Sequence, residues 1–366
     1  MTDLGIALGR VVFVLVFVLN LGGLMTWVER KQSAIMQDRI GANRASILGL
    51  RLFGLFHALA DVIKMLTKED FCPARVDRML FSLAPFVSTF FALVAFASIP
   101  FGHTLPIAGR EVLLQALTFD VGILYVFAML SLGVYGVMMA GWASANNYAL
   151  LGGQRAAALM ISAEIAIGAS IVGVVMVYGS LNLMDIARAQ GQPLLPELFG
   201  RWIPAWGILT QPLAFLLFLT AGIAATKRTP FDMPEGESEI IGYFVEYSGM
   251  KFGLFLMADF LETVVVAGLV VSLFLGGWQV PYLGPDGFAF PWGATVPLSH
   301  LAVSLLGVAA FVLKLVVMIW LMMLIRWTLP RFRYDQAMRL GWLGLFPLSI
   351  ANIVVTGLVL QWWSTW

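Results

Sequence analysis

The sequence is poor in charged residues, and this shortage restricts what the protein can be. Only 12% of its 366 residues are charged, and the formal net charge is +1. A soluble domain carries about 25% charged residues, so too few polar side chains are present to cover a water-facing surface. The composition therefore excludes a soluble enzyme, a disordered protein and a nucleic-acid binder.

The residues that build metal and nucleotide sites are also scarce. A single cysteine, Cys72, excludes a disulfide framework and any metal site made of several cysteines. The three histidines, His57, His103 and His300, lie far apart in the sequence and show no ligand spacing. The chain contains no glycine-rich dinucleotide motif and no P-loop, so nothing in it suggests a bound nucleotide.

Apolar residues, in contrast, make up 60% of the chain and gather in long runs. A run of about 20 apolar residues can cross a bilayer, and in lipid only a helix or a closed barrel satisfies its own backbone. The runs predict an all-α polytopic membrane protein that forms one integral membrane domain over residues 1–366. Eight transmembrane helices are expected, at 7–28, 79–100, 120–141, 156–178, 207–226, 252–275, 298–325 and 341–363.

The basic residues predict the orientation of these spans. Seventeen of the 22 lysine and arginine residues fall in or beside four loops, at 29–78, 142–155, 227–251 and 326–340. Because short loops rich in lysine and arginine stay in the cytoplasm, these four loops are expected to be cytoplasmic and both termini outside.

The loop at 29–78 contains an amphipathic pattern. Leucine, phenylalanine, valine and isoleucine recur at helical spacing between Leu52 and Leu66, while His57, Asp61 and Lys64 form the opposite stripe. The pattern predicts a helix that lies along the membrane interface. Such a helix could be a structural collar, or it could line the entrance for a lipid-soluble ligand.

The loop at 227–251 is unusually acidic for the positive side of a membrane. Five carboxylates occupy fifteen residues: Asp232, Glu235, Glu237, Glu239 and Glu246. Clustered carboxylates raise one another's pKa values and can hold protons near neutral pH. A solvated acidic loop is the alternative, but Pro230 and Pro234 favour a fixed one.

Four ionisable side chains lie inside the predicted spans: Glu164, Asp259, Glu262 and Lys314. Each costs about 2.5–3.5 kcal/mol at the bilayer centre, so it needs a partner, water or a function. Asp259 and Glu262 share a helix face because they are three residues apart, and one of them could pair with Lys314. The group is either a structural ion pair or part of a proton path.

Several segments together carry a family resemblance. The segment 228–235 reads RTPFDMPE, and the segment 246–252 reads EYSGMKF. With matching residues at 29–31, 39–44, 58–61 and 333–336, they resemble the H subunits of the bacterial proton-translocating NADH:quinone oxidoreductases, respiratory complex I. The resemblance covers nearly the whole chain.

The resemblance implies a multi-pass subunit of a respiratory enzyme in the bacterial cytoplasmic (inner) membrane. Such a subunit forms the membrane side of the quinone-binding chamber and the start of the proton-translocation path, and binds no cofactor itself. Quinone, either ubiquinone or menaquinone, is the substrate, and the iron–sulfur clusters and FMN belong to partner subunits. Its partners are soluble iron–sulfur and quinone-module subunits, small membrane subunits, antiporter-like subunits and lipid.

The resemblance also implies site residues. The quinone chamber would include Arg30, Arg39, Arg44, Phe53, Phe56, Asp61, Lys64, Phe231 and Asp232. The proton path would include Glu164, Glu235, Glu237, Glu239, Glu246, Asp259, Glu262 and Lys314. Arg331, Arg333 and Asp335 are suited to docking a soluble partner or a lipid headgroup. No catalytic residue and no metal ligand is expected.

The chain departs from the family pattern at a few positions. Ser131 and Ala225 stand where some members carry glutamates, and about five extra residues lie around 46–50. Three other functions stay open at this stage. They are the homologous membrane subunit of a group 4 hydrogenase, a stand-alone proton-coupled transporter and a purely structural anchor.

Overall fold

The protein is a bundle of long helices. The computed structural model describes residues 3–107, 110–194, 202–236 and 239–364. Within these ranges, seven helical stretches are long and apolar enough to cross a membrane, and an eighth is apolar but shorter. The prediction of an all-α multi-pass membrane protein is therefore confirmed, with seven long spans in place of eight equal ones.

The bounds of the helices follow the apolar runs. The long helices are α1 (Asp3–Met36), α3 (Arg78–Ala95), α4 (Gly122–Ala143), α5 (Asn147–Tyr178), α10 (Gly249–Phe274) and α11 (His300–Thr328). The last stretch joins α12 (Tyr334–Arg339) through a π-helical turn, Leu340–Leu345, to α13 (Phe346–Ser364). The shorter helices are α2 (Phe56–Thr67), α6 (Leu183–Ala189), α8 (Gly207–Thr210) and α9 (Pro212–Ala225).

The span expected at 207–226 is broken into α8 and α9. Pro212 has no N–H to donate, so it starts a new helix instead of continuing the old one. The buried joint is held by the Gln211 side chain, which donates to Thr356 and accepts from Asn352, both at 2.9 Å. The break is thereby fastened to α13.

Helix α5 begins well before the predicted residue 156. Its first turn is capped by the side chain of Asn146, which accepts from the N–H of Tyr148 at 2.9 Å. A capped helix can continue beyond the apolar run that marks the membrane. The loop predicted at 142–155 is therefore mostly helical.

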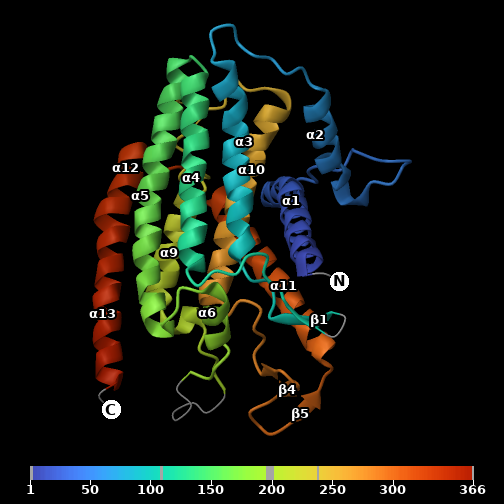
Figure 1. Cartoon of the computed structure of the whole chain (residues 1–366). Helices are drawn as coiled ribbons and strands as arrows, with labels where there is room; N and C mark the ends of the chain where they lie inside the picture. Colours follow the sequence, from blue (N-terminus) through green and yellow to red (C-terminus); the bar gives the residue numbers. More distant parts are fainter. Residues whose placement is uncertain (1–2, 108–109, 195–201, 237–238, 365–366) are drawn as a thin grey trace.

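Helix α10 occupies the centre of the bundle. In the apolar 18-residue stretch of α10, 83% of the residues are buried, whereas only 11% are buried in the corresponding stretch of α1. It packs against α3, α11, α1 and α9 (Figure 1). A charge on α10 is therefore surrounded by protein rather than by lipid.

Two small antiparallel sheets were not predicted. One pairs β1 (Thr104–Ile107) with β2 (Arg110–Leu113). The other joins β3 (Leu283–Gly284), β4 (Gly287–Ala289) and β5 (Thr295–Pro297). Figure 1 shows both at the lower end of the bundle, near α6. Strands this short leave no periodic signal in the sequence.

The charged loops meet at the opposite end. Ion pairs join Lys251 to Asp70 at 2.9 Å and Arg326 to Glu29 at 2.7 Å. Each pair links segments that are far apart in the sequence. Helix α2 lies at this end, beside α1 and α10, and is amphipathic as predicted (Figure 1).

Candidate functional site

The acidic loop is folded into the bundle rather than solvated. Phe231, Met233 and Tyr243 are buried, and Phe231 stacks on Phe332 with the ring centroids 5.2 Å apart. The Phe332 N–H donates to the Pro230 carbonyl at 2.8 Å. The loop is therefore a fixed part of the core, and it brings its carboxylates close to α10.

The centre of the site is a buried lysine that the sequence analysis did not single out. The side chain of Lys227 is 1% exposed, and its Nζ lies 2.9 Å from Asp259 Oδ1 and 3.0 Å from Glu262 Oε2. Burial alone would lower the pKa of Lys227, but attraction to the two carboxylates outweighs burial and holds it above its usual value. We call Lys227, Asp259 and Glu262 the buried triad.

The expected pairing of Lys314 with these carboxylates is wrong. Lys314 Nζ instead donates to the carbonyls of Leu275, Gly277 and Gln279, at 2.7, 3.0 and 2.7 Å. It also lies 4.5 Å from the ring of Trp206. The three carbonyls follow the end of α10, where the helix dipole is negative, so the ammonium caps this helix. A place for Lys314 on a proton path stays a prediction.

Two loop carboxylates lie within electrostatic reach of the triad. The pKa of Glu235 is raised, first by burial and then by repulsion from Asp259 and Asp232. The pKa of Asp232 is also raised, because burial outweighs the attraction of Arg331, whose Nη2 lies 3.0 Å from Asp232 Oδ2. Both loop acids thus retain protons more readily than exposed ones do.

Several polar atoms around these acids have no hydrogen-bond partner among the described residues. They are Glu235 Oε1, Asp232 Oδ1, Tyr243 Oη and Arg228 Nε. Buried polar atoms usually have a partner because leaving one unpaired costs about 1–3 kcal/mol. These four atoms are therefore open to a further hydrogen-bond partner.

On the far side of the triad lies Glu164. Its Oε2 accepts a hydrogen bond from Ser131 Oγ at 2.7 Å, and its charge acts on Glu262. Gly133 of α4 faces Glu262 and leaves room beside that carboxylate. The carboxylates therefore influence one another in succession, from the loop through the triad to α5.

The remaining acids of the loop lie at the edge of the site. Glu239 pairs with Arg155 at 2.8 Å and is exposed. Glu246 accepts from Asn146 at 2.8 Å and lines an open cavity of about 420 Å³. Glu237 lies outside the described residues.

The residues predicted for a quinone chamber are brought together only in part. Arg30 of α1 pairs with Asp61 of α2 at 2.6 Å, and Lys64 lies 3.6 Å from the same carboxylate. Glu29 joins this surface to the acidic loop, because Arg228 lies 3.5 Å and Arg326 2.7 Å from its carboxylate. The end of α1, the helix α2 and the acidic loop thus form one charged surface.

Other predicted residues lie apart from it. Arg39, Arg44 and Phe53 are exposed, and Phe56 is half-buried. Arg333 and Asp335 pair with each other on the surface at 2.7 Å. Arg331 is already held by Asp232, so it is less free to dock a partner.

Sequence reasoning missed Lys227, Ser131 and Glu29. Lys227 was counted only as a positive charge near the membrane edge, and no periodicity shows that the loop returns into the bundle. A hydroxyl such as that of Ser131 carries no charge to mark its position in a span.

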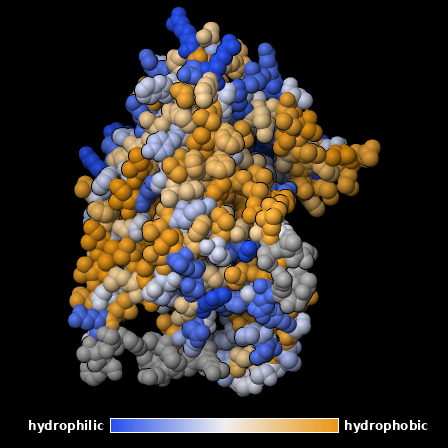
Figure 2. Space-filling view, in the orientation of Figure 1, coloured by the Kyte–Doolittle hydropathy of each residue, from blue (hydrophilic) through white to orange (hydrophobic). Residues whose placement is uncertain are grey.

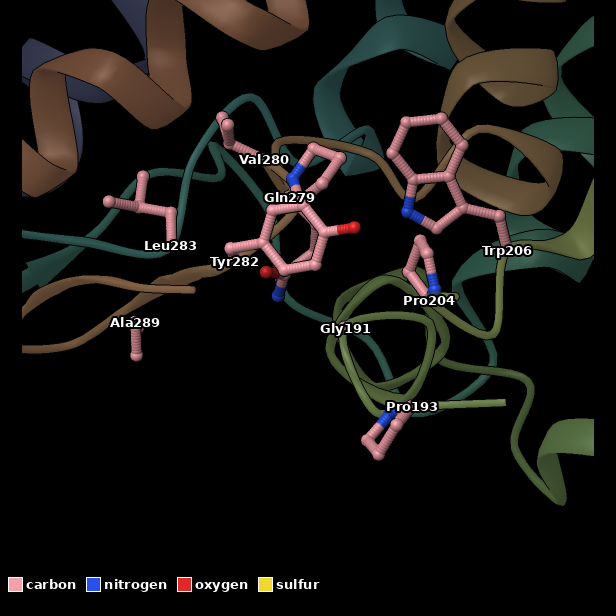
Figure 3. A pocket seen from close by; sticks show the side chains of 11 residues that line it. Gly191, Pro193, Pro204, Trp206, Gln279, Val280, Tyr282, Leu283 and Ala289 are labelled. Carbon is pink, nitrogen blue, oxygen red and sulfur yellow. The ribbon is translucent and has the colours of Figure 1, made fainter. Parts of the chain in front are cut away.

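A cavity at the other end of the bundle carries no comparable chemistry. Its volume is about 190 Å³, and residues of the segments 191–206 and 279–289 line it (Figure 3). No charged side chain is among the described residues that line it, although Trp206 and Gln279 also contact Lys314. Within the described ranges, no group of three or more histidine, cysteine, aspartate or glutamate residues is placed to hold a metal ion.

Comparison with known proteins identifies the family. A family model described as NADH dehydrogenase matches residues 9–357. The chain belongs to that family. Two similar proteins are H subunits of NADH-quinone oxidoreductase, one from Geobacter metallireducens and one from Thermomicrobium roseum. The first is 43% identical over 98% of both chains, and the second is 44% identical over 96% of this chain and 95% of its own.

Proposed function

We propose that this chain is the H subunit of an NADH-quinone oxidoreductase, complex I, in a bacterial inner membrane. The family membership and the full-length similarity to proteins of that name support the proposal. The chain acts as part of an enzyme and carries no redox centre itself. Iron–sulfur and FMN chemistry belongs to soluble partner subunits, with small membrane and antiporter-like subunits beside it in the membrane.

Its first role in the proposal is to form the membrane side of the quinone chamber. The charged surface at the ends of α1 and α2 supports this role, because a lipophilic quinone could enter beside an interfacial helix. The proposal places the charged loops on the cytoplasmic side of the membrane and both termini on the outside. The exposed pair Arg333–Asp335 is then available to a soluble partner.

Its second role is to start proton translocation, and the buried triad is the observation that carries it. With all groups ionised, one ammonium faces two carboxylates, so the triad has a net charge of −1. A proton on Glu235 removes its repulsion of Asp259, and transfer of that proton to a triad carboxylate leaves Glu235 negatively charged and the triad neutral. Glu164 is the next acceptor after the triad, and the coupled groups titrate as a set rather than singly.

The test is a matched pair of variants in the intact complex. Glu235→Gln removes a half-buried acid whose Oε1 is buried, whereas Glu239→Gln removes an exposed one. Proton pumping per NADH oxidised should fall severalfold in the first variant and stay near the wild-type value in the second. Wild-type pumping in Glu235→Gln, with assembly shown on a native gel, would remove Glu235 from the path.

The quinone role has its own test. A photoreactive quinone analogue should label residues 51–66 or their neighbours in the assembled complex. Labelling confined to other subunits would contradict an entrance beside α2.

A further inference from the structure

The segment 45–53 is an apolar hairpin that stands clear of the bundle. Ile47 and Leu50 exchange two backbone hydrogen bonds, at 3.1 and 2.9 Å, around a tight turn formed by Leu48 and Gly49. Leu48 is 104% exposed and Phe53 81% exposed, and Leu50 and Leu52 are also exposed. Figure 2 shows this hydrophobic projection at the side of the molecule.

The turn is poorly suited to water. Both turn residues have positive φ, 51° at Leu48 and 85° at Gly49, as a type I′ turn requires. Asparagine and glycine favour this conformation, whereas a leucine in it is uncommon. A strained and fully exposed leucine indicates a surface that is covered by something apolar.

The base of the hairpin is rigid. His57 Nε2 accepts hydrogen bonds from the N–H groups of Arg44 and Ala45, both at 3.1 Å. Gly54 lies against the Ala42 carbonyl, and any side chain at this position would collide with it. The hairpin is therefore held in one direction relative to α2.

One hydrogen bond fixes the level of the hairpin along α1. Trp27 Nε1 of α1 donates to the Phe53 carbonyl at 3.1 Å. Trp27 lies just before Glu29 and Arg30, where an apolar span meets charge, and tryptophan is enriched at this level of a membrane. The hairpin then projects sideways from α1 rather than beyond the charged end of the bundle (Figure 1).

The charges beside the hairpin suit a lipid surface. Arg39, Arg44 and Arg51 are exposed, and the segment 39–53 contains no acidic residue. Basic residues beside an apolar insertion attract anionic headgroups. We infer that the hairpin 45–53 inserts into the headgroup region of the bilayer beside α2, with its flanking arginines bound to anionic phospholipids.

The inference does not rest on quinone chemistry, and cross-linking tests it directly. The intact complex would be purified in nanodiscs of phosphatidylethanolamine and phosphatidylglycerol, with Leu48→p-benzoylphenylalanine as the probe. Illumination should attach phospholipid to this position. The same probe at the exposed Glu69 is the matched control and should gain severalfold less lipid. An adduct of position 48 with another subunit, or lipid attachment no greater than at Glu69, would overturn the inference.

A second set of variants separates insertion from chance proximity. With the probe at Ile47, Leu48→Asn plus Leu50→Asn should reduce lipid attachment severalfold, because asparagine suits the turn but not the lipid. Arg44→Gln plus Arg51→Gln should shift the adducts from phosphatidylglycerol to phosphatidylethanolamine. Unchanged attachment in the first double variant would contradict insertion, and an unchanged lipid ratio in the second would contradict the arginine contacts.

Discussion

Lys227 is buried and Lys314 half-buried, both lie at the central helix α10, and they are held in different ways. Lys227 faces the carboxylates of Asp259 and Glu262, which are ionisable groups. Lys314 faces three backbone carbonyls that follow the end of the same helix, and a backbone carbonyl neither gains nor loses a proton near neutral pH. A lysine inside a membrane therefore indicates function only when its partners are known.

Removing the charge of Lys227 should have the largest effect. Lys227→Met leaves two carboxylates without a counter-charge, and breaking a buried pair in this way typically costs about 3–5 kcal/mol. Native gels should show little assembled complex. Adding Asp259→Asn and Glu262→Gln should restore assembly but leave proton pumping absent. Normal pumping in the assembled triple variant would reduce the triad to a structural ion pair.

Lys314→Met should have a smaller effect of a different kind. Hydrogen bonds to a charged group contribute about 1.5–3 kcal/mol each, and their effects are not additive. We expect a lower thermal midpoint. Pumping per NADH in the assembled variant tests the proton-path prediction for Lys314, because wild-type pumping would leave it a role in capping the helix only. The same Asp259→Asn and Glu262→Gln changes should not restore stability here. Rescue by them would mean that the two lysines share partners after all.

The pH dependence should distinguish the two regions further. Because burial and neighbouring acids raise the pKa of Glu235, the folded protein favours its protonated form. The stability that this proton contributes is present at low pH and is lost as the pH rises through the raised pKa. Glu235→Gln should therefore flatten the fall in thermal stability that follows as the pH rises above the ordinary glutamate pKa of 4.5. The exposed Glu239→Gln serves as the comparison, and the same fall in wild type and Glu235→Gln would contradict the shift.

The smallest effects are expected at Glu164 and its hydrogen-bond partner Ser131. Ser131→Ala removes one hydrogen bond to Glu164 and should cost about 1 kcal/mol. Glu164→Gln keeps the shape and an acceptor for Ser131, so the complex should assemble while pumping falls. Pumping at the wild-type rate in assembled Glu164→Gln would end the path at the triad.

The sequence predicted the architecture well because long apolar runs have few alternatives in lipid. It did not predict the break at Pro212, because the residues on both sides of it are equally apolar. The early start of α5 was missed for a related reason, since hydropathy marks the membrane rather than the helix.

The candidate site was predicted only in its acidic half. Asp259, Glu262 and Glu164 were recognisable because charge is rare in a span. Their cation was assigned to Lys314, which lies inside a span, rather than to Lys227, which lies at its edge. Only the return of the loop into the bundle decides between the two, and that depends on tertiary packing.

The position of the triad has a consequence for how the chain is inserted into a membrane. Lys227 follows the end of α9, and both of its carboxylate partners lie on α10, the next long helix. The lysine can therefore pair with both carboxylates within a single helical hairpin before α11 and α13 are synthesised. The α9–α10 hairpin can enter the bilayer as a unit, with its most costly side chains already paired.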